Sequence, residues 1–137
     1  MTRSIEPVNP PALPKPAGFS YGYVAVGGRT LYIAGQVARD ANNAVVGKGD
    51  VVAQFGQVCE NLRTVVSTAG GALTDVVKLT IYVLDVDDYK RHIRAIGGVY
   101  REHFGRHFPA MTLVGARDLF DAADGCLIEI EGVAVLP

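Results

Sequence analysis

Cysteine is scarce in this 137-residue sequence: Cys59 and Cys126 lie far apart and outside any C-x-x-C pattern. Neither a disulfide framework nor a zinc site is indicated, because both need clustered or regularly spaced cysteines. Long apolar runs are absent too, since none reaches the ~18 residues that span a bilayer, and no signal pattern opens the chain. We therefore expect a soluble, cytoplasmic protein without a membrane partner.

An excess of charge of one sign is also missing. The net charge is −1, and acidic and basic residues are interspersed, so no basic stripe is present to attract nucleic acid. His92, His103 and His107 lack the spacing of a metal-binding motif, and the glycine-rich turns lack a phosphate-loop pattern. The sequence predicts no metal site, no cofactor and no nucleic-acid partner.

The length and the 49% hydrophobic content suffice for one domain with a single core. Most of the seven prolines lie within residues 1–17, which predicts an extended N-terminal arm on the surface. We expect residues 18–137 to form the single domain.

Two strands and one helix are predicted for the first half of that domain. Residues 21–26 and 30–36 have β-type composition, and the glycine turn between them favours a hairpin. Asp50 then precedes apolar residues spaced by three and four, which is typical of an amphipathic helix, and Gly70-Gly71 ends it.

The second half continues with a strand, a helix and two strands. Residues 76–84 alternate between apolar and polar, and a helix is predicted from Asp87 or Asp88 to Gly105. Strands at 111–115 and 126–135 complete the order ββαβαββ. This order predicts an α+β fold with two helices on one face of a sheet, and the mixed character of the other face suggests pairing with another subunit.

The second predicted helix has two kinds of residue in its sequence. An apolar stripe is expected to pack on the sheet, formed by Tyr89, Ile93, Ile96, Tyr100 and Phe104. Its basic residues are interpreted as the solvated side, namely Lys90, Arg91, Arg94 and Arg101.

Two glutamates near the end of the chain are the most informative residues. In the strand Ile-Glu-Ile-Glu at 128–131, Glu129 and Glu131 lie on one face, because successive side chains point to opposite sides. Carboxylates among aliphatic neighbours are costly to bury. They must therefore be exposed at an edge or enclosed in a polar pocket for a reason.

Four segments together resemble the RidA/YjgF family, whose members are described as imine deaminases and as endoribonuclease L-PSP proteins. They are Ala-Gly-Gln at 34–36 where the family has Ser-Gly-Gln, Val-Val-Lys-Leu-Thr-Ile-Tyr-Val-Leu-Asp at 76–85, Phe-Pro-Ala at 108–110, and Ile-Glu-Ile-Glu at 128–131. The resemblance runs from Tyr21 to the C-terminus. It implies a chorismate-mutase-like fold, a homotrimer around a central sheet barrel, and small-molecule clefts between neighbouring subunits.

The resemblance also implies site residues. Glu129 matches the family's water-positioning glutamate, the alternative being a structural carboxylate. Tyr21 matches a tyrosine of the cleft, or is plain packing. Family members that deaminate 2-imino acids carry a carboxylate-binding arginine directly after Pro-Ala, whereas Met111 stands here. A thioether cannot make the paired hydrogen bonds of a guanidinium, so this is a divergent member lacking the motif arginine.

The remaining candidates line the implied cleft. Ala34 and Gly35 lie where backbone groups can approach a ligand, although a simple bulge is the alternative. Met111, Thr112 and Leu113 form its wall by resemblance, or Met111 fills the space and no site remains. Arg117 is a candidate replacement anchor, or else a solvated residue paired with Asp118.

The favoured function is that of a small-molecule hydrolase acting on a reactive enamine, imine or related carbonyl compound. Ordinary 2-imino acid deamination is disfavoured by Met111. The alternative is a non-catalytic protein that binds ligands or other proteins, so the sequence leaves open whether the chain is an enzyme. A ribonuclease or translation-inhibitor role is a third option, which the charge balance disfavours.

Overall fold

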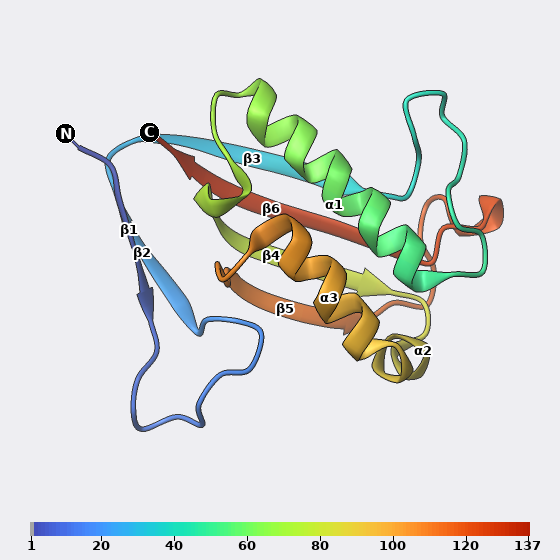
Figure 1. Cartoon of the computed structure of the whole chain (residues 1–137), viewed down its shortest axis with the longest axis horizontal. Helices are drawn as coiled ribbons and strands as arrows, with labels where there is room; N and C mark the ends of the chain where they lie inside the picture. Colours follow the sequence, from blue (N-terminus) through green and yellow to red (C-terminus); the bar gives the residue numbers. More distant parts are fainter. Residues whose placement is uncertain (1) are drawn as a thin grey trace.

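The computed structural model describes residues 2–137 and has an α+β fold, as predicted. These residues form three α-helices and two sheets, and the helices cover one face of the larger sheet (Figure 1). The larger sheet has the strand order β3-β6-β4-β5. Its strands are Arg29–Gln36 (β3), Ile128–Leu136 (β6), Val76–Val83 (β4) and Ala110–Gly115 (β5).

β6 lies in the middle of the larger sheet and runs antiparallel to β3 on one side and to β4 on the other. β4 and β5 are parallel, so the chain between them crosses over through helices, as parallel neighbours require. Along β6, Ile128 and Ile130 are fully buried under the helices, whereas Glu129 and Glu131 point the other way. The predicted placement of both glutamates on one face is confirmed.

Helix α1 (Val51–Thr68) begins where the sequence predicts. The Asp50 carboxylate accepts hydrogen bonds from the N–H groups of Val52 and Ala53 at 3.0 and 3.1 Å, and so satisfies two of the free donors of the first turn. After the last helical residue the chain passes through Gly70, whose φ of 93° suits glycine. The glycine stop is therefore confirmed.

The second predicted helix is divided into α2 (Val86–Arg91) and α3 (Ile93–Phe104). The prediction of one continuous helix is wrong, because the His92 ring bonds the Asp88 carbonyl oxygen at 2.9 Å and its backbone leaves helical geometry. The predicted N-cap, Asp87 or Asp88, is also wrong. Asp85 caps α2, because its carboxylate accepts a hydrogen bond from the Asp88 N–H at 3.0 Å. Gly105, with a φ of 62°, ends α3 as predicted.

The predicted hairpin of residues 21–26 and 30–36 does not form. Gly22–Val26 (β2) pairs with an additional strand in the N-terminal arm, Ser4–Val8 (β1), and the two make a separate small sheet to the left in Figure 1. Arg3 holds this sheet to the domain, through Asp75 at 2.7 Å and the Val135 carbonyl oxygen at 3.1 Å. Such contacts between distant residues are not visible in a local turn pattern.

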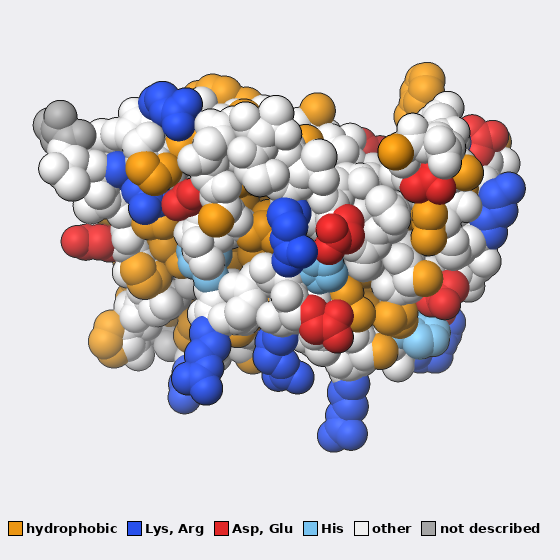
Figure 2. All heavy atoms as spheres, turned by 45° about the horizontal axis from the view of Figure 1, so that its top comes forward, with side chains coloured by type: hydrophobic (Ala, Val, Ile, Leu, Met, Phe, Trp, Pro, Cys, Tyr) orange, Lys and Arg blue, Asp and Glu red, His pale blue; other side chains and the backbone are white. Residues whose placement is uncertain are grey.

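The core lies between the helices and the larger sheet. Among its fully buried side chains are Leu62, Leu79, Ile128 and Ile130. At the surface, Figure 2 shows acidic and basic side chains interspersed over the helix-bearing side. Of the helices described between residues 2 and 137, none combines the length and the apolar character that a bilayer crossing requires.

Candidate functional site

The larger sheet has one uncovered face, which we call the open face. In a single chain this face is solvent-accessible: Tyr32 on β3 is 80% exposed, and further polar side chains lie on the same face of β4, β5 and β6. These polar residues are Lys78, Thr80, Tyr82, Thr112, Glu129 and Glu131. An open face of this composition matches the surface at which the sequence predicts another subunit.

Glu129 lies against Gly35 on the open face. The pairing of β3 with β6 is irregular between Ile33 and Gln36, so neither Ala34 nor Gly35 has a residue opposite it in register. A Cβ built on Gly35 would collide with the Glu129 carboxylate. Glycine at position 35 therefore lets the Glu129 carboxylate take up this position, for reasons of space rather than of φ, which is not positive. The bulge also leaves backbone groups near the carboxylate. Among residues 2–137 the Glu129 carboxylate accepts no hydrogen bond.

Glu131 has a partner, unlike Glu129. Its carboxylate accepts a hydrogen bond from the Tyr82 hydroxyl at 2.9 Å. This hydrogen bond raises the pKa of Tyr82, because the bond is lost when the phenol ionises. The two glutamates therefore differ in what they offer: Glu131 is held within the sheet, and Glu129 remains available.

A cavity of about 450 Å³ lies on the other side of the sheet, and we call it the helix-side cavity. It is bounded by α3, by β5 and by residues 17–19, where the N-terminal arm ends. Most of its lining is apolar or aromatic, from Ala17, Gly18, Phe19, Phe55, Ile81, Tyr89, Ile93, Ile96, Gly97, Tyr100, Phe108, Met111 and Leu113, with Arg101 at the edge. Its size and lining suit a small organic molecule.

The predicted cleft wall is divided between these two regions. Met111 and Leu113 line the helix-side cavity. Thr112, between them, faces the open side, where its Oγ1 accepts a hydrogen bond from Lys78 Nζ at 3.0 Å. Because Met111 is opposite buried Leu79 and Glu129 is opposite Tyr82, Met111 and Glu129 lie on opposite faces of one sheet. A single chain does not bring them together.

Two further predicted residues, Tyr21 and Arg117, neither line the helix-side cavity nor belong to the strands of the open face. The Tyr21 hydroxyl donates to the Pro14 carbonyl oxygen at 2.8 Å, and its ring contacts Phe19 edge-on, with centroids 5.2 Å apart. Arg117 is exposed after the end of β5 and does not line the helix-side cavity. Asp118 accepts from the Leu119 N–H, and it forms no ion pair with Arg117.

The sequence patterns assign no site role to four residues that line the helix-side cavity, namely Tyr89, Ile93, Gly97 and Arg101. The last three follow one another at intervals of four, so they lie along one side of α3, and this spacing is the signal that could have indicated them. Arg101 is exposed, as predicted, and also belongs to the cavity lining. Tyr89 is mostly buried, which raises its pKa to about 12, so it stays a neutral phenol.

The histidines make local hydrogen bonds. His107 Nε2 donates to the Val76 carbonyl oxygen at 2.6 Å, and His103 Nε2 lies 2.8 Å from a Glu60 carboxylate oxygen. Within residues 2–137, no three His, Cys, Asp or Glu side chains gather closely enough to hold a metal ion. Cys59 is buried, which raises the pKa of its thiol to about 12 and makes it a poor nucleophile at neutral pH.

Comparison with known families gives a match over most of the chain. The model of the family described as Endoribonuclease L-PSP matches residues 12–136. The chain belongs to the RidA/YjgF family. The matched range begins inside the arm of residues 1–17, which the sequence analysis had placed outside the resemblance.

Individual RidA/YjgF relatives agree with this assignment. A RutC family protein of Pyrococcus horikoshii is 37% identical over 121 residues, which cover 88% of this chain and 90% of the relative. The human 2-iminobutanoate/2-iminopropanoate deaminase is 30% identical over 115 residues, covering 84% and 79%. Among solved structures, YyfB of Yersinia pestis, a Rid family protein of unknown function, has a TM-score of 0.84 at 37% identity, covering 96% of this chain and 98% of that one.

Proposed function

We propose that this RidA family member is a homotrimeric hydrolase that acts on a reactive enamine, imine or related carbonyl compound in clefts between its subunits. Family membership supports the reaction class, since relatives at 29–31% identity are named 2-iminobutanoate/2-iminopropanoate deaminases. In this proposal an enamine first tautomerises to its imine, and water adds to the carbon of the C=N bond to give a carbinolamine. Proton transfer from oxygen to nitrogen then breaks the C–N bond, so that the amine or ammonia leaves and a carbonyl compound remains.

The available carboxylate of Glu129 is the observation on which the proposal depends. A carboxylate without a protein partner can accept a proton from water, or hold the water in line for attack. Gly35 gives it room, and neither Ala34 nor Gly35 has a register partner, so their backbone groups can bond a polar substrate atom, although the Ala34 carbonyl oxygen already accepts one hydrogen bond, from Gln36 Nε2 at 3.1 Å. For Tyr21 to orient the substrate, its hydroxyl must leave the Pro14 carbonyl oxygen, or its ring must enter the cleft of a neighbouring subunit.

The position of the cleft follows from the opposite faces of Met111 and Glu129. Since one chain separates them by the thickness of the sheet, a shared cleft must join the cavity wall of one subunit to the open face of another. This arrangement agrees with the polar and exposed character of the open face, which a trimer would cover.

The substrate preference follows from Met111. A guanidinium would hold a carboxylate with paired, charge-assisted hydrogen bonds, and Met111 offers only polarisable, apolar surface. We expect turnover of the imines of alanine and 2-aminobutanoate to be at least about tenfold to a hundredfold below that of relatives with the arginine. Imines generated in place by an amino-acid oxidase, with ammonia release as the readout, test this. Family-typical rates would contradict our interpretation of Met111.

Restoring the arginine is the sharper test. Met111→Arg is expected to raise hydrolysis of short 2-imino acids by about tenfold or more, if the rest of the cleft is intact. Leu113→Arg is the control, because it adds the same charge to the same cavity wall two residues away. No gain in Met111→Arg with the trimer preserved would favour the alternative, a non-catalytic binding protein.

Sharing of the site between subunits is testable by mixing inactive variants. We expect Glu129→Gln and Met111→Trp to be inactive alone. Co-expression should restore about a quarter of the sites, because each cleft takes Met111 from one subunit and Glu129 from another, and in randomly mixed trimers both are unaltered in about one cleft in four. Recovery of no activity, with mixed trimers demonstrated by two affinity tags, would contradict a shared cleft. Incubation with RNA separates the ribonuclease option, for which we expect no cleavage.

A further inference from the structure

We propose that Arg101 on α3 supplies the positive charge that strand position 111 lacks, and that the helix-side cavity selects a carboxylate with a bulky apolar or aromatic body. This inference rests on the proposed function, because it takes the cavity wall at Met111 to be the substrate side of the cleft. It goes further by naming the residue that recognises the anion and the class of molecule that fits.

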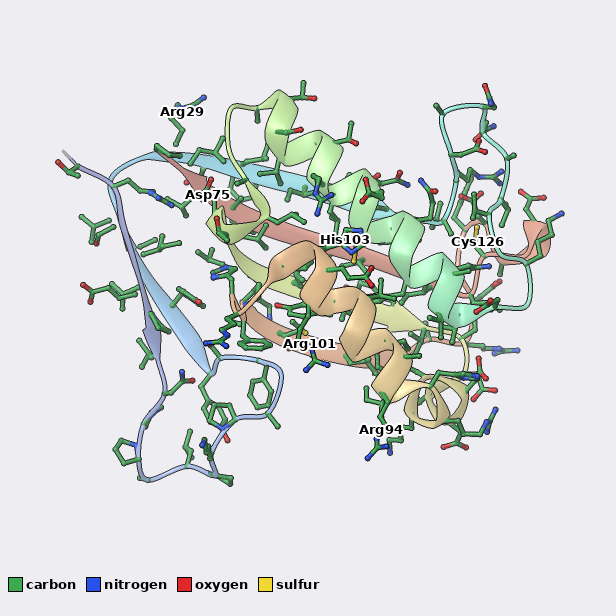
Figure 3. The ribbon with its side chains drawn as sticks, viewed as in Figure 1. Arg29, Asp75, Arg94, Arg101, His103 and Cys126 are labelled. Atoms are coloured by element: carbon green, nitrogen blue, oxygen red, sulfur yellow. The ribbon has the colours of Figure 1, made fainter. Side chains whose placement is uncertain are left out.

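Arg101 is the only charged residue among the described residues that line the cavity. Its guanidinium takes part in no hydrogen bond and no ion pair within residues 2–137, whereas Arg3, Arg39, Arg63 and Arg91 each contact a carboxylate. In Figure 3 its side chain projects from the part of α3 that lies over β5. A guanidinium without a protein partner at the edge of an apolar cavity attracts an anion whose remaining part is apolar.

The cavity wall indicates the size of that apolar part. Ile93, Gly97 and Arg101 lie along α3 at intervals of four residues, so the wall from Ile93 to Arg101 is about 12 Å long. Aromatic rings line much of it, including Phe19, Phe55 and Phe108. The imine of alanine would leave most of this wall uncovered, whereas an aromatic side chain would cover more of it.

Gly97 keeps the cavity accessible. A Cβ added at Gly97 meets nothing within 4 Å, and glycine in a helix interior costs about 1 kcal/mol relative to alanine. The chain therefore keeps a destabilising residue where a larger side chain would extend into the open space beside the cavity. Gly98 also has open space around it, but it does not line the cavity, and it provides a matched control.

The chemistry of the site favours a carboxylate over a phosphate. One guanidinium can form two parallel hydrogen bonds with a planar carboxylate, which carries a single charge. Among the described lining residues no second cation is present to balance a dianion. Tyr89 adds a neutral hydroxyl that donates to no acceptor within residues 2–137, and it is available to a polar atom of the ligand.

Calorimetry of the assembled protein with 3-phenylpropanoate, its neutral amide and acetate tests the inference without turnover. We expect the carboxylate to bind at least about tenfold more tightly than the amide, and acetate not to bind measurably. Arg101→Gln should abolish the preference for carboxylate over amide, and Arg101→Lys should retain part of it. Arg94→Gln, on the same helix but outside the cavity lining, should leave the preference unchanged (Figure 3).

Size selection is tested by the glycine pair. Gly97→Leu should weaken binding of both the carboxylate and the amide by about tenfold or more, and Gly98→Leu should not, although both changes remove a helical glycine. Equal affinity of carboxylate and amide in the unaltered protein, or an equal loss in Arg94→Gln, would overturn the inference.

The outcomes separate this inference from the proposed function. Carboxylate binding that depends on Arg101, without hydrolysis of any imine, would remove the proposed function and leave the binding site standing. Hydrolysis of imines with a KM that is unchanged in Arg101→Gln, for both aromatic and small substrates, would remove the role of Arg101 and leave the proposed function standing.

Discussion

The two faces of the larger sheet offer opposite chemistry. On the open face, polar side chains of β4, β5 and β6 are accessible, and Glu129 lies beside a backbone irregularity at Gly35. Behind the same strands, the helix-side cavity is mostly apolar, and Arg101 is the one charged side chain among its described lining residues. Under the proposed function, the first region positions water and moves a proton, and the second holds the body of a substrate.

Under the proposed function, this difference makes a single chain incomplete. Side chains on the two faces of one sheet point away from each other, so Met111 on β5 and Glu129 on β6 do not meet within one chain. We propose that a second copy, with its open face against the cavity edge of the first, brings them together.

Removing the acid of the open face should have the largest effect. Glu129→Gln keeps the shape of the side chain and removes its basicity, and we expect hydrolysis to fall by about a hundredfold or more. Glu131→Gln is the control, because that carboxylate is already bonded to Tyr82. Rates are measured by ammonia release, and assembly by sedimentation. Equal losses in both variants would indicate a general effect of charge on this face.

Adjacent residues of β4 contrast the two faces in stability. Leu79→Ala leaves a void in the core, and the free energy of unfolding should fall by about 2–5 kcal/mol. Thr80→Ala, on the open face, should change it by no more than about 0.5 kcal/mol. Urea unfolding at matched protein concentration measures both. A large loss in Thr80→Ala that depends on concentration would reveal an assembly contact there.

Gly35→Ala tests the close approach of the Glu129 carboxylate. The added methyl group would collide with the end of a flexible side chain, so we expect Glu129 to move, activity to fall by about tenfold, and the fold to persist. Gly22→Ala is a matched control, since its Cβ would meet only Val8 at an ordinary 3.8 Å. Unchanged activity in Gly35→Ala would show that the position of Glu129 is not critical.

The ion pair that holds the small sheet should have the smallest effect. Asp75 accepts from Arg3 at 2.7 Å and from the Ala72 N–H at 2.8 Å, so Asp75→Asn should lower the free energy of unfolding by about 1 kcal/mol. Proteolysis between residues 9 and 21 should become faster, because the arm is released. Glu6→Gln, at an exposed position of β1, should change neither quantity.

Several elements were predictable because their signals are local. The Asp50 cap, the Gly105 stop and the alternation of Ile128, Glu129, Ile130 and Glu131 each depend on neighbours within a few residues, and the structure confirms them. The β1 strand and its pairing with β2 were missed, because the partners lie on opposite sides of the proline-rich segment, as Ser4 and Val26 do, and no local pattern records such pairing. The break at His92 was missed because a side chain competes there with the helix backbone.

Local sequence patterns predicted which residues alternate, where α1 begins and where α3 ends. The four matching segments indicated the RidA/YjgF family and, by resemblance, Met111 at the position of its arginine. The three-dimensional arrangement revealed that Met111 and Glu129 lie on opposite faces of the sheet, that Gly35 leaves space for the Glu129 carboxylate, and that Arg101 lines the helix-side cavity together with Met111. The physical reason is that strand pairing and helix packing bring together residues separated by many positions in the chain, and no local pattern records those contacts.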